Sequence, residues 1–138
     1  MPKIHGGCLC GAVRYQSDAE PVVTAICQCT HCQKQSGSAF AVNIGVPKGT
    51  LRYTGEIPAL YRDSGESGQA VDRRFCARCG SPVVSEVQAT PKLDWVKAGT
   101  LDDTTWVKPQ AAGWCRSAQA WVSLAADITQ FPTTRPPA

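Results

Sequence analysis

The chain of 138 residues is 43% hydrophobic and 18% charged, values ordinary for a globular protein, so we expect a single domain over residues 1–138. Its formal net charge of +3 comes from scattered basic residues with one adjacent pair, Arg73–Arg74, which argues against a nucleic-acid-binding surface. No apolar run approaches the ~18 residues of a membrane span, and the first residues lack the apolar stretch of a secretory signal, so we expect a cytoplasmic protein.

Short stretches that alternate apolar and polar residues recur along the chain and predict β-strands. They lie at 12–17, 22–27, 39–46, 50–55, 70–75, 82–87 and 93–99. Gly- and Asp-rich segments between several of them predict turns. A short helical turn is expected either after Cys29 or at 123–128. The pattern indicates a mainly β fold of short antiparallel strands that carries metal-binding loops.

Eight cysteines in four groups are the strongest chemical signal in the sequence: Cys8/Cys10, Cys27/Cys29/Cys32, Cys76/Cys79 and Cys115. In a reducing compartment such closely spaced thiols are more typical of a metal site than of disulfides. Zinc is the natural occupant, because it prefers four ligands in a tetrahedron and binds sulfur well. We therefore predict zinc sites.

Two of these groups predict a closed structural site. The segment FCARCGSP at 75–82 is a C-x-x-C followed by glycine, which places two thiolates on one ion. Cys8 and Cys10, also flanked by glycines, are the matching second half. Together Cys8, Cys10, Cys76 and Cys79 would hold a structural zinc. The alternative is that Cys8 and Cys10 are simply buried apolar side chains.

The third group, Cys27, Cys29 and Cys32, supplies three thiols for a second ion. The fourth ligand could come from His31, Cys115, water or a substrate; His31 lies on a turn that tends to point it away from the ion. If the position is open, an ion held by three thiolates is a weak activator of water and accepts a further thiol better. The interpretation we favour is a small-molecule thiol as the missing ligand.

The order of these motifs resembles a known family. GGCLCGAVRY, CQCTHCQKQSGSAFAV and FCARCGSPV, then AGTLDD and Trp121 before DITQFP, are similar to the glutathione-dependent formaldehyde-activating enzymes, whose domain is shared with centromere protein V. The resemblance covers a core of about 5–132. It implies a β-tent fold with two zinc ions, a structural one on the four-cysteine set and a catalytic one on Cys27, Cys29 and Cys32.

By the same resemblance the activity is that of a carbon–sulfur lyase acting in reverse, which joins formaldehyde to glutathione and gives S-hydroxymethylglutathione. The carboxylates of glutathione call for basic partners, for which Lys34, Arg73 and Arg74 are candidates. The chain departs from the family pattern at Gln28, where many members carry histidine, and at Cys115, near a position where they often carry histidine.

Two other functions compete with the enzyme. A non-catalytic zinc-stabilised β domain that binds a protein or nucleic-acid partner predicts that Cys115 or His31 closes the second site. A metal or redox sensor with exposed thiolates is the third possibility, because Cys115 has no assigned role.

Overall fold

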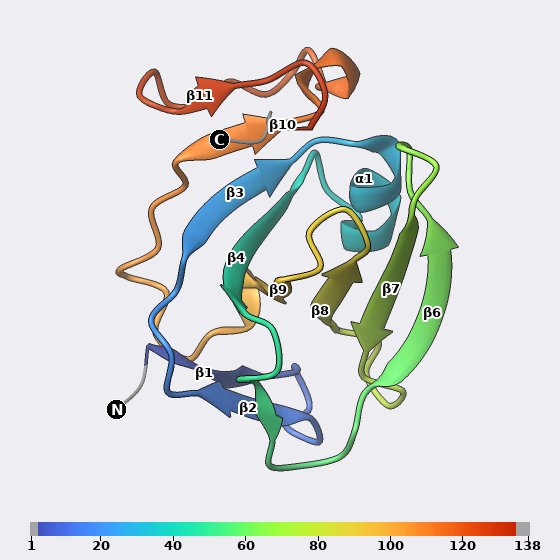
Figure 1. The fold of residues 1–138 in the computed structure, drawn as a ribbon, viewed down its shortest axis with the longest axis vertical. Helices are drawn as coiled ribbons and strands as arrows, with labels where there is room; N and C mark the ends of the chain where they lie inside the picture. The colour runs from blue at the N-terminus through green and yellow to red at the C-terminus, as the bar shows by residue number, and fades with distance from the viewer. Residues whose placement is uncertain (1–2, 135–138) are drawn as a thin grey trace.

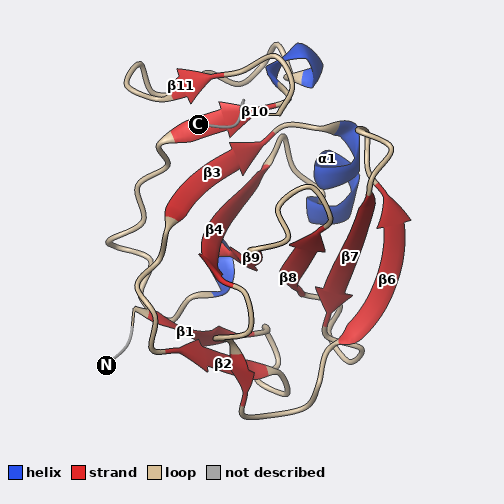
Figure 2. Cartoon of the chain, viewed as in Figure 1, coloured by secondary structure: helices blue, strands red, loops and turns tan. Residues whose placement is uncertain are grey.

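The computed structural model describes residues 3–134, and within them strands outnumber helices (Figure 2). The strands are β1 (Ile4–Gly7), β2 (Arg14–Ser17), β3 (Val23–Cys27), β4 (Ala41–Pro47), β5 (Arg52–Tyr53), β6 (Ala59–Ser64), β7 (Ala70–Phe75), β8 (Pro82–Val87), β9 (Leu93–Lys97), β10 (Ala111–Gly113) and β11 (Thr129–Gln130). The α-helix of this region is α1 (Thr30–Ser36), and two 3-10 helices are η1 (Ala98–Thr100) and η2 (Cys115–Ser117). The mainly β prediction is confirmed.

The strands form two sheets. A large sheet has the order β11-β10-β3-β4-β9-β8-β7-β6, and a small one the order β1-β2-β5. Figure 1 shows the small sheet at one end of the molecule, while α1 lies at the other end, between the ends of β3 and β4 and the edge formed by β7 and β6. Pairing is antiparallel except at one edge, where β10 runs parallel to both β3 and β11. This edge differs from the purely antiparallel prediction.

The hydrophobic core lies between the small sheet and one face of the large sheet. Ile44 and Val96, paired across β4 and β9, are fully buried there, and Ile4 and Tyr15 cover them from the small sheet. The hydroxyl of Tyr15 lies 2.7 Å from Oγ1 of Thr100, which links the small sheet to η1, the segment that directly follows β9.

The first strand, β1, also approaches η1 closely, and a glycine makes this possible. A Cβ at Gly6 would lie 2.2 Å from the carbonyl oxygen of Thr100, closer than real Cβ atoms approach. Only glycine therefore lets the backbone of β1 pass this close to η1. The sequence IHGG does not alternate as a strand should, and β1 was accordingly missing from the prediction.

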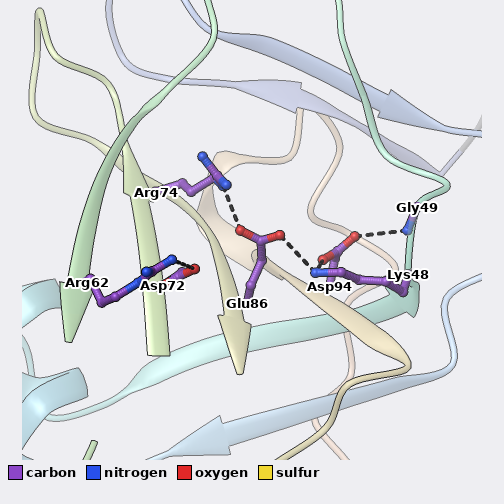
Figure 3. Close-up of polar contacts among 7 residues, drawn as sticks. All are labelled: Lys48, Gly49, Arg62, Asp72, Arg74, Glu86 and Asp94. Carbon is purple, nitrogen blue, oxygen red and sulfur yellow. Dashed lines mark hydrogen bonds and ion pairs between the residues drawn. The ribbon is translucent and has the colours of Figure 1, made fainter. Parts of the chain in front are cut away.

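The opposite face of the large sheet is polar. Arg73 is paired with Ser85 across β7 and β8, and Lys97 with Asn43 across β9 and β4, and these side chains point toward the α1 side. Successive residues of a strand point to opposite faces, so Arg74 points the other way. There it joins an ion-pair network with Glu86 and Lys48 (Figure 3).

Most predicted elements are present with shifted ends. The seven predicted strands correspond to β2, β3, β4, β5, β7, β8 and β9, and the helical turn expected after Cys29 is α1. The alternative helix at 123–128 is wrong: this segment contains no helix. Four strands were missed, β1, β6, β10 and β11. No helix among residues 3–134 is long and apolar enough to cross a membrane.

Candidate metal centres

Four cysteine sulfurs meet where two turns face each other. Cys8 and Cys10 lie in the turn between β1 and β2, and Cys76 and Cys79 in the turn between β7 and β8; all four Sγ atoms lie within 4.8 Å of one another. The Cys8–Cys10 and Cys10–Cys76 separations are 3.6 and 3.8 Å. Sulfurs at 2.3 Å from a tetrahedral zinc would be roughly 3.8 Å apart, so this donor set fits the ion.

Local hydrogen bonds shape both turns for this purpose. Gly80, with φ of 80°, closes the second turn by donating its backbone N–H to the Cys76 carbonyl at 2.8 Å. The backbone N–H groups of Val13 and Arg78 donate to the sulfurs of Cys8 and Cys76. Hydrogen bonds from Ser81 lower the pKa of Cys79 to about 5. These donors favour thiolates, the form in which cysteine binds metal.

The second group is built at the start of α1. Cys27 ends β3, Cys29 is the N-cap of α1 and Cys32 lies in its first turn, and the three Sγ atoms lie within 4.8 Å of one another. Cys29 has an extended backbone, and its sulfur accepts the backbone N–H of Cys32 at 3.2 Å. The side chain that would bind an ion therefore also caps the helix.

Within residues 3–134, no further Cys, His, Asp or Glu ligand atom joins this three-sulfur group. His31 points to Asp63, with Nδ1 at 2.8 Å from Oδ2. The Cys115 thiol donates to the carbonyl of Ala112 at 3.4 Å. Both protein candidates for a fourth ligand thus have other partners, and within residues 3–134 the group has three protein ligands.

Two buried cations lie beside the three-sulfur group. Arg73 is 4% exposed, and its Nη1 lies 3.8 Å from the Cys32 sulfur, while its Nε donates to Asp63 at 2.9 Å. Lys97 is 8% exposed, and its Nζ donates to Asn43 at 2.9 Å. Burial lowers the pKa of Lys97, whereas the Cys32 thiolate acts to raise it.

Of the three thiols in this group, Cys32 is the one whose pKa is lowered. Hydrogen bonds from Cys27 and Cys29 hold the pKa of Cys32 far below the usual thiol range, and Lys97 and Arg73 lower it further. The same hydrogen bonds, together with burial, raise the pKa of Cys27. The thiolate thus forms next to the guanidinium of Arg73, as expected for opposite charges in a buried place.

The segment after β10 covers the helix and this group. Trp114 packs against Cys29 and Cys32 with φ of 58°, the one positive φ of a non-glycine residue in 3–134, and Arg116 stacks 4.9 Å from its ring centroid. Left-handed strain at a bulky residue marks a position that the surrounding structure enforces. No sequence pattern predicts this position of Trp114, because the parallel pairing of β10 with β3 brings it here.

The basic candidates for binding a carboxylate divide between the two faces. Arg73 is buried under the three-sulfur group and paired with Asp63. Arg74 is not at this site: it binds Glu86 at 2.7 Å on the opposite face, so that prediction was wrong. Lys34 lies exposed in the last turn of α1. Lys97 and Asp63 were missed. The period-2 pattern of β9 was a signal for Lys97, whereas β6 has no such pattern that could have placed Asp63.

Comparisons with known proteins agree on one family. The family profile described as "Glutathione-dependent formaldehyde-activating enzyme" matches residues 3–117. Two relatives, from Aspergillus flavus and Aspergillus oryzae, carry the name "Putative glutathione-dependent formaldehyde-activating enzyme" and are each 30% identical over 94 residues, 66% of this chain and 48% of theirs. A Penicillium rubens protein of the same name is 29% identical over 94 residues, with the same coverage.

This chain spans about half the length of these curated relatives. A crystal structure of a Rhodobacter sphaeroides protein matches with a TM-score of 0.59 and 22% identity, covering 77% of this chain and 92% of that one. At this identity the match establishes a shared fold.

Proposed function

The chain belongs to the glutathione-dependent formaldehyde-activating enzyme family, and we propose that it joins the thiol of glutathione to formaldehyde, giving S-hydroxymethylglutathione. This is a carbon–sulfur lyase reaction run toward synthesis. The observation that carries the proposal is the three-sulfur group of Cys27, Cys29 and Cys32, to which no fourth protein ligand is added among residues 3–134. A structural site would be closed by four ligands.

The two sulfur groups have different roles in this proposal. Cys8, Cys10, Cys76 and Cys79 would hold a structural zinc that joins the small sheet to the large one. Cys27, Cys29 and Cys32 would hold the catalytic zinc, which when bound would supply an open position that favours the thiolate form of an arriving thiol. The protein acts in the cytoplasm on a small-molecule thiol.

The reaction itself balances with one thiol and one aldehyde. The thiol gives its proton to solvent, and its sulfur lone pair forms a bond to the carbonyl carbon. The π-electron pair of the carbonyl moves to oxygen, which takes up one proton from solvent. The chain contributes position, because the three-sulfur group, Arg73 and Lys97 fix where an anionic sulfur is held before the aldehyde arrives.

The geometry counts against the non-catalytic alternative. A binding module with two closed zinc sites requires Cys115 or His31 on the second ion. The sulfur of Cys115 donates to a backbone carbonyl, and His31 is bonded to Asp63, so each would have to leave an existing partner.

Cobalt substitution followed by titration with reduced glutathione tests the proposal, because the sulfur-to-cobalt charge-transfer band reports the number of bound sulfurs. We expect the band to grow and saturate in the wild-type protein and not in Cys29→Ser. Serine is a good N-cap, so this variant removes one metal ligand and leaves α1 capped. Carbon-13 NMR of labelled formaldehyde then follows the product.

The proposal is refuted if the cobalt spectrum shows two four-sulfur sites before any thiol is added and does not respond to glutathione. That result would favour the binding module. The control is Cys115→Ser, which leaves the three-sulfur group intact and should titrate as the wild type does. A loss of the response in Cys115→Ser would make Cys115 a ligand.

A further inference from the structure

We propose that Arg73 and Lys97 form a buried cationic floor under the three-sulfur group, which makes its open position selective for an anionic ligand, a thiolate, over a neutral one. The inference rests on the proposed metal role of Cys27, Cys29 and Cys32. It adds the residues that decide which ligand the site accepts, which neither the cysteine spacing nor the family membership assigns.

The contacts that carry the inference come from three strands of the large sheet. Arg73 on β7 reaches the Cys32 sulfur with Nη1 at 3.8 Å and Gln35 Oε1 at 3.3 Å. Lys97 on β9 is held by Asn43 of β4 at 2.9 Å. Both cations are less than a tenth exposed, so neither is a solvated surface charge.

A third polar group on this face has no partner. Ser85, paired with Arg73 across β7 and β8, is 3% exposed, and its Oγ makes no hydrogen bond within residues 3–134. Buried hydroxyls are normally bonded, and an orphan points to a further polar group that completes the site. Ser85 is therefore another buried polar group beside Arg73 on this face.

Charge counting shows what the floor does. A divalent ion with three thiolates has a net charge of −1, and Asp63, bonded to Arg73, adds another negative charge. Arg73 and Lys97 bring the net charge of this set of groups to zero before a fourth ligand binds. Without them an arriving anion would meet a charge of −2 in a place of low dielectric, where repulsion is strong. The binding of a neutral ligand depends much less on this net charge.

Strand alternation supplies matched controls. Arg74 follows Arg73 on β7 but points to the other face, where it binds Glu86; Lys48 binds the same carboxylate at 2.8 Å (Figure 3). Arg74→Gln and Lys48→Met therefore remove one positive charge each without touching the cationic floor.

The test titrates cobalt-loaded proteins with 2-mercaptoethanol, an anionic ligand once its thiol proton is released to solvent, and separately with imidazole, a neutral one. We expect Arg73→Gln and Lys97→Met to bind 2-mercaptoethanol about 10- to 100-fold more weakly, the range found when groups supporting metal ligands are removed. Imidazole binding should change little, and both controls should behave as the wild type. Arg73→Lys, which keeps the charge, should recover much of the thiol affinity.

Equal losses for both ligands, or equal losses in Arg74→Gln, would overturn the inference, because they indicate general damage to the fold. Failure of Arg73→Lys to recover thiol binding would also overturn the charge argument. If the charge effect is found but glutathione and formaldehyde give no carbon–sulfur product, the proposed function fails and the inference stands. A wild-type protein that binds neither ligand overturns both.

Discussion

Replacing Asp63 by Asn tests whether the buried charges beside the three-sulfur group are balanced as described. Oδ2 of Asp63 accepts hydrogen bonds from Arg73 Nε at 2.9 Å and His31 Nδ1 at 2.8 Å, and the two partners of the ion pair have side chains 5% and 13% exposed. Asn keeps the volume and removes the charge. The guanidinium then loses its carboxylate partner and keeps only neutral acceptors, Gln35 and the new amide, beside the Cys32 sulfur.

Removing one partner of a buried pair costs about 3–5 kcal/mol, because the other charge is left uncompensated. The Cys32 thiolate offers Arg73 part of the lost counter-charge, and Asp63 is not wholly buried, so we expect the lower end, about 3 kcal/mol. Urea unfolding of the zinc-loaded protein, followed by circular dichroism, measures this as a lower midpoint at an unchanged slope.

The double variant Asp63→Asn/Arg73→Gln decides the cause. Because the uncompensated guanidinium is also removed, the double variant should be more stable than Asp63→Asn alone by about 1 kcal/mol, and the two single losses should not add, as is typical of residues in contact. If the two single losses simply add, or if Asp63→Asn alone costs less than about 1 kcal/mol, the pair is not a buried ion pair of this kind and the reasoning is refuted.

Three further predictions concern the fold. A chelator at pH 7 should abolish the cooperative unfolding transition, because binding of structural zinc contributes roughly 10–16 kcal/mol, while the free energy of unfolding of a whole domain is about 5–15 kcal/mol. Cys10→Ser, at an exposed position, should lower the urea midpoint only when zinc is present. Burial acts to raise the pKa of Glu86, but its two basic partners outweigh burial and lower the pKa from 4.5. The ionised carboxylate therefore stabilises the fold above pH 4.5, and this stabilisation is lost as the pH falls. Glu86→Gln should lower the free energy of unfolding by about 1 kcal/mol at pH 7 and not at all near pH 2, as measured by urea midpoints. Tyr15→Phe removes the hydroxyl bonded to Thr100 and should lower the free energy of unfolding by about 1 kcal/mol in the same assay. An unchanged midpoint would show that this hydrogen bond does not stabilise the contact between the small sheet and η1.

The sequence was informative where chemistry and short-range spacing coincide. Cysteines two or three residues apart predicted which thiols would meet, and alternation found the strands with one apolar face. It failed where structure depends on distant pairing. β6, the edge strand at Ala59–Ser64, has mostly exposed residues on both faces and no pattern to detect. β10 is three residues long and exists because β3 and β11 pair with it.

Arg73 and Arg74 show the same limit at the site. Both arginines have carboxylate partners, Asp63 and Glu86, and both were equally good candidates from sequence. Only the register of β7 against β8 decides that one is buried beside the three-sulfur group and the other joins the network on the opposite face. A slip of one residue would exchange them.

The end of β7 borders the other sulfur group, one residue beyond a register shift between Arg74 and Phe75. The strand ends at Phe75, and Cys76, next in the chain, belongs to the four-sulfur group that faces the small sheet. A zinc ion there would fix the end of β7 and, three residues back, the face to which Arg73 points. The two sulfur groups are then coupled through one strand, although they lie in different parts of the molecule. A zinc ion on the four-sulfur group would therefore stabilise the fold and, by the same contacts, help to keep the guanidinium beside Cys32.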